Sequence, residues 1–209
     1  MKVLVIAPHA DDEVLGVGGT IQWHNSKGHE VYVCVVTNRV IDHKIDENYF
    51  LETKKNAEKA KSVLGIRKYI FCDLRDEHLD ESLIEVIMPI EKVINDIRPN
   101  VVYIPNESDT NQDHRAVFWA CRVACRKIDK IIIYEVPSST PSFNANLYVK
   151  LSEEFMQNKI KAMDCYESEV RPYPNPRSSE GLLTIAKMRG MESNQKMAEA
   201  FIVFREVFE

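Results

Sequence analysis

The length, composition and charge of the chain exclude several classes of protein. Its 209 residues suffice for the buried core of one domain, and shares of 44% hydrophobic and 28% charged residues are those of a folded enzyme rather than a disordered chain. The formal net charge of −5 and the lack of a Lys- or Arg-rich block argue against a nucleic-acid partner and favour a small-molecule one.

The chain opens with an apolar run, KVLVIA at 2–7, which predicts a buried strand, and a helical pattern follows at 13–27. The run is too short for the apolar core of a signal peptide. No segment approaches the roughly 18 apolar residues of a membrane span, so we expect no such span. Between strand and helix stands the sequence PHADDE, residues 8–13.

Short β-type runs and longer helical patterns then alternate along the chain. Strands are expected at 30–37, 68–73, 101–105 and 130–136, and helices at 48–64, 80–97 and 114–127. Gly28, Gly65 and Pro99 stand where helices should end. The alternation predicts the α/β class, as a Rossmann-like three-layer sandwich with a mostly parallel sheet.

The last third of the chain has a different pattern. A polar loop at 137–146 precedes an amphipathic helix near 152–166. A second loop at 171–179 holds three of the nine prolines and leads into a last helix near 179–190. Because no linker separates this part, we expect a single domain over 1–209 whose part 137–209 walls the pocket.

The cysteines and glycines have plain interpretations. The five cysteines include no CxxC pair, which predicts reduced thiols and a cytoplasmic location. Cys121 and Cys125 stand four apart, and core packing is favoured over a metal site because no His or third Cys is near. The GVGG segment, residues 16–19, is separated from the strand by PHADDE, which favours close packing over a phosphate-binding loop.

Two clusters of histidine and acids follow predicted strands. His9, Asp11 and Asp12 come after the first strand, and Asp113 and His114 come after the strand at 101–105. Taken singly, each cluster also suits a helix start, where acids cap the backbone. Because the carboxyl ends of parallel strands meet at the edge where α/β sheets bind ligands, the two clusters together favour a functional site.

His9 and Asp12 stand three apart across a tight turn and can reach one metal ion, to which His114 can add a third ligand. Three protein ligands leave open the position where a catalytic zinc holds water, whose pKa falls to about 7. Asp11 points elsewhere, so we expect it to act beside the metal as a general base. Zn²⁺ is the expected ion, and Fe²⁺ is the alternative. Glu13 is expected to be an acidic residue at the start of the helix.

The sequence resembles a known family, the zinc-dependent N-deacetylases called LmbE-like or PIG-L-like, which act on N-acetylglucosamine conjugates. Their first motif, HPDDE with a later GG pair, is similar to residues 9–13 with Gly18 and Gly19. Their second, HxDH, is similar to residues 111–114, and a looser likeness lies at 177–201. The likeness covers essentially the whole chain. The resemblance implies that zinc is bound by His9, Asp12 and His114. It also implies that Asp11 is the general base.

Two positions depart from the motifs. Ala10 replaces a proline, which we expect to be tolerated because neither side chain can bind a metal. Asn111 replaces a histidine that, by the resemblance, stabilises the oxyanion or protonates the leaving amine, whereas asparagine donates a hydrogen bond but is no general acid near neutral pH. Either Asp11, once protonated by the attacking water, transfers that proton to the leaving nitrogen, or the chain is a slow or specialised member of the family. Asp109 and Asp113 are expected to order this loop, and Asp113 is counted among the catalytic residues because it can orient a neighbour.

Three arginines are candidate contacts for a substrate. Arg39 and Arg75 follow the second and third strands, and Arg177 lies in the proline-rich loop. Guanidinium donors suit a hydroxyl-rich or phosphorylated sugar.

The sequence therefore predicts a zinc-dependent hydrolase that removes the acetyl group from an N-acetylated amino sugar or sugar conjugate. One alternative is a metal-containing sugar-binding or regulatory protein with little or no turnover, with Asn111 as the sign of that loss. Another is a hydrolase of a different amide or ester. The oligomeric state is left open, a homo-oligomer included.

Overall fold

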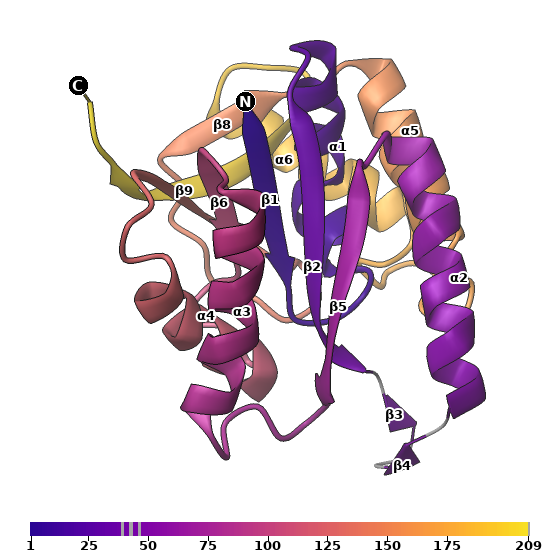
Figure 1. Ribbon diagram of the computed structural model, residues 1–209. Coiled ribbons are helices and arrows are strands. Elements are labelled where there is room, and N and C mark those ends of the chain that lie inside the picture. The colour runs from indigo at the N-terminus through magenta and orange to yellow at the C-terminus, as the bar shows by residue number, and fades with distance from the viewer. Residues whose placement is uncertain (39, 42–43, 46, 209) are drawn as a thin grey trace.

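The computed structural model describes residues 1–38, 40–41, 44–45 and 47–208 of the chain. A central sheet is flanked by helices on both faces (Figure 1), which confirms the predicted α/β class and the mostly parallel sheet. The strands are β1 (Lys2–Ala7), β2 (Glu30–Asn38), β3 (Val40–Ile41), β4 (Lys44–Ile45), β5 (Lys68–Arg75), β6 (Val101–Ile104), β7 (Lys130–Tyr134), β8 (Leu147–Lys150) and β9 (Ala198–Glu206). The helices are α1 (Asp12–Ser26), α2 (Glu47–Leu64), α3 (Leu83–Ile97), α4 (Gln112–Ala124), α5 (Glu153–Asp164) and α6 (Ser179–Glu192).

Strand β1 lies in the interior of the sheet. Within the described residues the larger sheet has the order β5-β2-β1-β6-β7-β9-β8, and β1 pairs in parallel with both β2 and β6. The chain proceeds from β1 outward to β2 and β5, then returns to the other side of β1 as β6 and β7. The strand order therefore reverses between β1 and β6, and such a switch point opens a crevice at the carboxyl ends of the strands.

Both faces of β1 are buried, which explains its continuous apolar sequence. Val3 and Val5 belong to the core under α1, α2, α5 and α6, whereas Leu4 and Ile6 belong to the core under α3 and α4. Alternate residues of a strand point to opposite faces, so the run KVLVIA supplies both cores at once.

Two strands of the main sheet, β8 and β9, lie in the part of the chain where the sequence predicted only loops and helices. They run antiparallel to each other, and β9 runs antiparallel to β7. The usual apolar alternation is broken in β9, because Glu199 is buried although it is charged. Its carboxylate accepts hydrogen bonds from the backbone of Gly19 and Thr20 in α1, at 2.9 and 2.7 Å.

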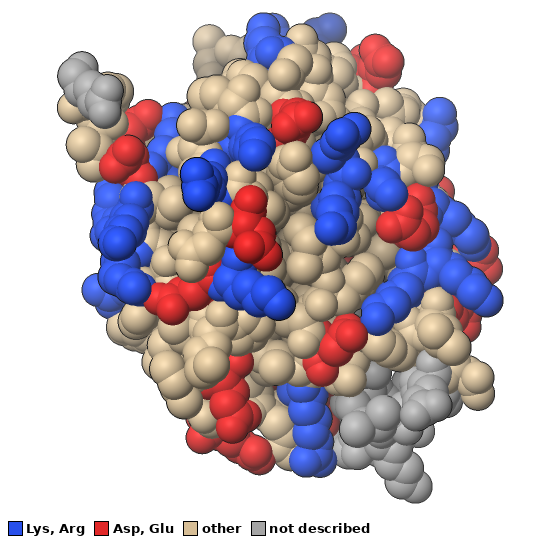
Figure 2. All heavy atoms as spheres, viewed as in Figure 1, with Lys and Arg blue, Asp and Glu red and all other residues tan. Residues whose placement is uncertain are grey.

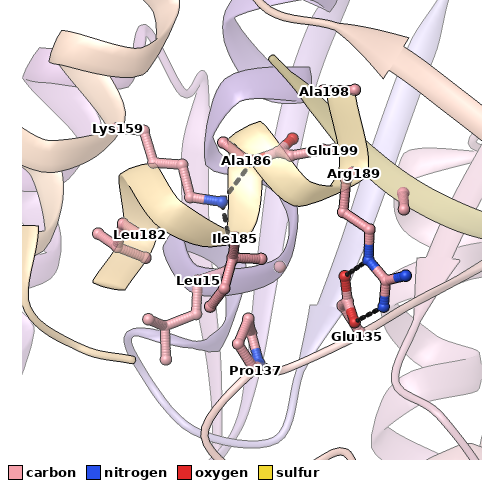
Figure 3. Close-up of a pocket in the computed structure, with 12 residues that line it drawn as sticks. Leu15, Glu135, Pro137, Lys159, Leu182, Ile185, Ala186, Arg189, Ala198 and Glu199 are labelled. Atoms are coloured by element: carbon pink, nitrogen blue, oxygen red, sulfur yellow. Dashed lines mark hydrogen bonds and ion pairs between the residues drawn. The ribbon is translucent and has the colours of Figure 1, made fainter. Parts of the chain in front are cut away.

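Buried ion pairs attach the late elements to the rest of the fold (Figure 3). Lys159 Nζ of α5 lies 2.6 Å from Glu199 Oε1 of β9. Arg189 of α6 pairs with Glu135, which follows β7, at 2.6 Å. The space between these side chains is only about 10 Å³, so the four charges hold elements together and do not line a ligand site.

The described part of the chain contains no helix that is long and apolar enough to cross a bilayer. Lys and Arg are interspersed with Asp and Glu on the face shown in Figure 2. Cys121 and Cys125 are buried in the core that includes α4, as the packing interpretation predicted.

The glycines of the GVGG segment allow close packing, as the sequence predicted. A Cβ atom on Gly16 would lie 2.8 Å from the carbonyl oxygen of Glu135, and one on Gly19 would lie 2.6 Å from Leu151 Cδ2. Both separations are shorter than van der Waals contact, so α1 approaches its neighbours more closely than alanine allows.

Replacing Gly16 with alanine should destabilise the protein by about 1 to 3 kcal/mol, because the backbone carbonyl that it meets cannot move aside without shifting the chain. Chemical denaturation measures the change. Gly18→Ala is the matched control, since its Cβ would meet side-chain atoms only, the nearest being Lys159 Cγ at 3.1 Å, and alanine favours the helix. Equal losses in the two variants would contradict the packing account.

Candidate metal centre and active site

Two loops that leave neighbouring strands carry the central residues of the site. His9 and Asp12 lie where β1 leads into α1, and His114 lies in the first turn of α4, after β6. The parallel pairing of β1 with β6 places these two loops at the same edge of the sheet. The structure thus brings together the three residues that the sequence predicted as metal ligands.

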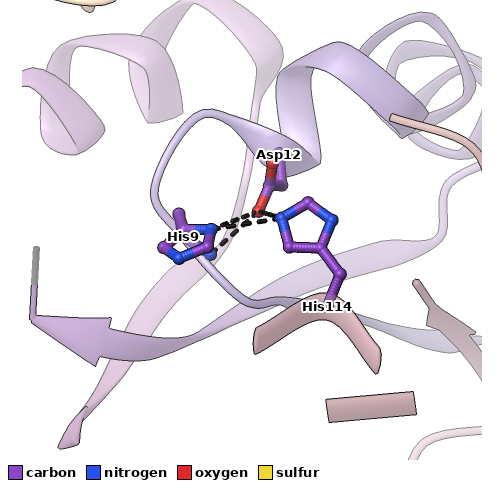
Figure 4. Close-up of side chains that lie close together, drawn as sticks. All are labelled: His9, Asp12 and His114. Atoms are coloured by element: carbon purple, nitrogen blue, oxygen red, sulfur yellow. Dashed lines mark hydrogen bonds and ion pairs between the residues drawn. The ribbon is translucent and has the colours of Figure 1, made fainter. Parts of the chain in front are cut away.

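The three side chains form a small triangle (Figure 4). His9 Nδ1 lies 3.3 Å from Asp12 Oδ2 and 3.2 Å from His114 Nε2, and the third side, from His114 Nε2 to Asp12 Oδ2, is 3.2 Å. Ligands held tetrahedrally at 2.0 to 2.1 Å from a zinc ion are separated by about 3.3 to 3.4 Å. The spacing of the three atoms therefore fits tetrahedral coordination of a single metal ion.

Carboxylates on the far side of each ring orient the two histidines. His9 Nε2 lies 2.8 Å from Asp76 Oδ1, and His114 Nδ1 lies 3.1 Å from Asp109 Oδ2. When each neutral ring carries its proton on the nitrogen that faces Asp76 or Asp109, the other nitrogen is available to bind a metal ion in the triangle. Asp12 Oδ1 is also buried without a hydrogen-bond partner among the described residues, which adds unsatisfied negative charge at the same place.

The cluster binds protons tightly when it holds no ion. Burial lowers the pKa of His114, but Asp12 and Asp109 outweigh it and raise the pKa to about 9. Burial likewise lowers the pKa of His9, and hydrogen bonds to Asp113, Asp12 and Asp76 raise it well above its ordinary value. A proton or a metal ion can neutralise these acids, so the two compete for the same site.

A second group of possible ligands shares His9 with the first and contains Asp76 and Asp113. Its carboxylates are already engaged by the backbone. Asp113 accepts hydrogen bonds from the N–H groups of Glu77 and Leu79, at 2.7 and 3.2 Å, and lies 3.4 Å from His9 Nε2. Asp113 thus fixes the loop after β5 and supports His9 from behind, which is where the structure places this predicted catalytic residue.

Asp11 has an unusual backbone conformation, with φ of 120°. A conformation of this kind costs on the order of 1 to 3 kcal/mol and persists where the surroundings hold the residue. Its N–H donates to Glu13 Oε2 at 3.0 Å, and its carboxylate Oδ2 lies 3.3 Å from the guanidinium of Arg177. The predicted base is fully buried and is held at both its backbone and its side chain.

Glu13 lies in the first turn of α1, as expected, but its side chain is buried instead of solvated. The hydroxyl groups of Tyr69 and Tyr166 each donate to Glu13 Oε1 at 2.8 Å. Burial raises the pKa of Glu13 to about 7, although both hydroxyl groups favour the charged form. This support for Asp11 was not apparent in the sequence, because the two tyrosines lie 56 and 153 residues away.

Asn111 caps the helix that carries His114. Its Oδ1 accepts the N–H of Asp113 at 2.8 Å, which leaves the amide nitrogen of Asn111 as the group that can donate into the pocket. Asp109 organises the same loop, because it accepts the N–H of Asn111 in addition to the ring of His114.

A pocket of about 490 Å³ opens onto these residues, a volume typical of small-molecule sites. All of the described side chains that line it are polar or charged, among them His9, His114, Asn111, Ser139, Arg171 and Arg177. Arg75 is exposed and lines a separate hollow beside the start of α3. Arg39, the remaining predicted substrate contact, lies outside the described residues.

Comparison with known proteins identifies the family. Residues 4–125 match the family described as PIG-L: GlcNAc-PI de-N-acetylase. The chain belongs to the PIG-L family. It is 32% identical to the uncharacterized deacetylase YaiS of Escherichia coli (strain K12), over 79% of this chain and 90% of that protein. It is 28% identical to the diacetylchitobiose deacetylase of Thermococcus kodakarensis, over 95% of this chain and 81% of that enzyme.

The fold of this PIG-L protein also matches solved structures. The conserved protein TT1542 of Thermus thermophilus superimposes with a TM-score of 0.85 at 23% identity, covering 99% of this chain and 96% of that one. At this identity the likeness shows the shared fold alone.

The sequence did not indicate Asp76 as a residue of the site. It stands in CDLRDEH, directly after β5, so its position at a strand end was the available signal. The sequence favours the neighbouring Arg75 as a site residue, whereas in the structure the acid is buried and the arginine is exposed.

Binding of a divalent ion at pH 7 should release at least one proton per chain, because His114, with a pKa of about 9, must lose its proton to act as a ligand. Titration of Zn²⁺ into chelator-treated protein, in weak buffer with a pH indicator, measures the release. Since this pKa is raised, the proton is bound below it, and the part of the release that comes from His114 should shrink as the pH rises through about 9. Release of clearly less than one proton per chain at pH 7 would contradict the assignment.

Proposed function

We propose that this PIG-L protein is a metal-dependent hydrolase that removes the acetyl group from an N-acetylated amino sugar or sugar conjugate. The observation that carries the proposal is the buried triangle of His9, Asp12 and His114, whose three possible ligand atoms lie 3.2 to 3.3 Å apart beside a polar pocket. The similarity to a diacetylchitobiose deacetylase supports an N-acetyl sugar as the substrate class.

The triangle would hold Zn²⁺, with Fe²⁺ as the alternative, and such an ion supplies a Lewis acid and activates water at neutral pH. Asp11 would accept the proton of the attacking water at its carboxylate. The amide nitrogen of Asn111 would donate a hydrogen bond to the oxyanion that forms as the carbonyl is attacked. Because Asn111 cannot supply a proton, Asp11 would pass its own to the leaving nitrogen as the C–N bond breaks, giving acetate and a free amine.

The lining of the pocket favours a hydrophilic substrate. The described lining contains no apolar side chain against which an acyl chain or aromatic group could be buried. A free amino sugar or a small polar conjugate fits this lining better than a lipid-linked one. The free thiols of the five cysteines support a cytoplasmic location, which we include in the proposal.

A sugar-binding protein with little turnover is the second candidate, and Asn111 is the observation that favours it, since the family motif has a histidine there. Metal content cannot separate the two candidates. A protein of this second kind would bind N-acetyl sugars and release no acetate.

Acetate release from a panel of N-acetylhexosamines and their polar and lipid conjugates tests the proposal. We expect turnover of at least one polar substrate. Asp11→Asn should lose most activity, on the order of 100-fold or more, and keep its metal, whereas Asp12→Ala and His114→Ala should lose the metal as well.

Asp76→Asn separates the two possible ligand sets, because it removes a charge behind His9 but no atom of the triangle. It should lower the metal affinity by about 10- to 100-fold without abolishing binding. Full metal retention in the Asp12 and His114 variants would refute the ligand assignment. Absence of acetate release from every member of the panel, with metal bound, would refute the activity.

Replacing Asn111 with histidine should leave the metal content unchanged, since Asn111 is not part of the triangle. If a general acid is limiting, the turnover number should rise about tenfold or more, because proton donation contributes at least that much. The variant should also be less stable by about 1 kcal/mol, because the cap on Asp113 is lost. A fall in turnover in a folded, metal-loaded variant would instead show that Asn111 is adapted to its substrate.

A further inference from the structure

We infer that Arg177 is a positioning residue that holds the carboxylate of Asp11 in place, and that it is itself held by Glu169 and Tyr49. The inference rests on the proposed function, in which Asp11 is the base. It gives Arg177 a different role from the substrate contact that the sequence predicted.

The contacts form a continuous chain from the surface helix α2 to the base. Tyr49 Oη of α2 donates to Glu169 Oε1 at 2.5 Å. Glu169 Oε2 accepts from Arg177 Nη1 at 3.0 Å, and Arg177 Nη2 lies 3.3 Å from Asp11 Oδ2. One guanidinium thus spans two carboxylates, using a different nitrogen for each.

The burial of this cluster favours the ion pairs of Arg177 with Asp11 and Glu169 over a contact with a substrate. The side chains of Asp11 and Glu169 are 0% and 6% exposed, and that of Arg177 is 19% exposed. If the guanidinium turned away to contact a substrate, two buried carboxylates would each lose an ion pair, which is unfavourable. The planar fork of arginine reaches both carboxylates, whereas the single ammonium of lysine would not.

The same segment of the chain also reaches the backbone of Asp11. Tyr166 accepts the N–H of Glu169 at its carbonyl oxygen, 2.8 Å away, and its hydroxyl donates to Glu13. Glu13 in turn accepts the N–H of Asp11. Residues 166–177 therefore fix the base at its main chain through Glu13 and at its carboxylate through Arg177.

The alternative is that Arg177 contacts the substrate directly, since it lines the pocket. The two roles predict different kinetics. Loss of a substrate contact raises KM, whereas misplacement of the base lowers kcat and leaves KM nearly unchanged.

The test compares Arg177→Met, Arg177→Lys, Glu169→Gln and the double variant with the native enzyme, using the substrate found in the acetate-release panel. Arg177→Met should lower kcat by about 10- to 100-fold, change KM by less than about threefold, and keep the metal content. Arg177→Lys should recover part of kcat. Glu169→Gln should act in the same direction, and the double variant should be no worse than Arg177→Met.

Arg126→Met is the matched control, because Arg126 pairs with Glu91 on the surface between α3 and α4. It should leave kcat and KM unchanged. Thermal denaturation checks folding, and if Arg177→Met does not fold, Arg177→Lys and Glu169→Gln decide the question.

A raised KM with native kcat, or native values of both, would overturn the inference while the proposed function stands, provided that Asp11→Asn is inactive. If the native protein releases no acetate from any substrate, the proposed function fails and the inference fails with it.

Discussion

The parallel pairing of β1 with β6 is the constraint on which the site depends. Val3, Leu4 and Val5 of β1 face Val101, Val102 and Tyr103 of β6 in register. Because both strands run in the same direction, the loops after them leave the sheet side by side, and His9 and His114, 105 residues apart in sequence, approach to 3.2 Å. A sheet in which β1 and β6 were not neighbours would have no such triangle.

Residues from three loops surround the triangle and the base. Asp76 follows β5, Asp109 follows β6, and Arg177 comes from the proline-rich loop beyond α5. The two acids contact the outer ring nitrogen of each histidine, and the arginine contacts Asp11, which precedes Asp12 in the chain. The surroundings of the centre thus come from three loops, two of which follow strands of the sheet while the third connects α5 to α6.

The sequence predicted the features that local pattern controls, namely the βα alternation, the parallel sheet and the two polar clusters at matched strand ends. It failed where a contact depends on distant partners. Glu199 interrupts the apolar pattern of β9 because its partners, Lys159 and the backbone of α1, come from elsewhere in the chain. Asp76 was missed for the same reason, since its partner His9 lies 67 residues away in the sequence.

Asn111 affects both the proposed ligand His114 and the role proposed for Asp11. Asparagine is among the best helix-capping residues, and here it caps the helix that presents His114, so it fixes a proposed ligand while removing an imidazole from the pocket. Without that imidazole, the proposed mechanism assigns both proton steps to Asp11. A base that must accept and return the same proton needs its carboxylate placed correctly in both steps, which gives the contact with Arg177 more weight than it would have with a histidine at position 111.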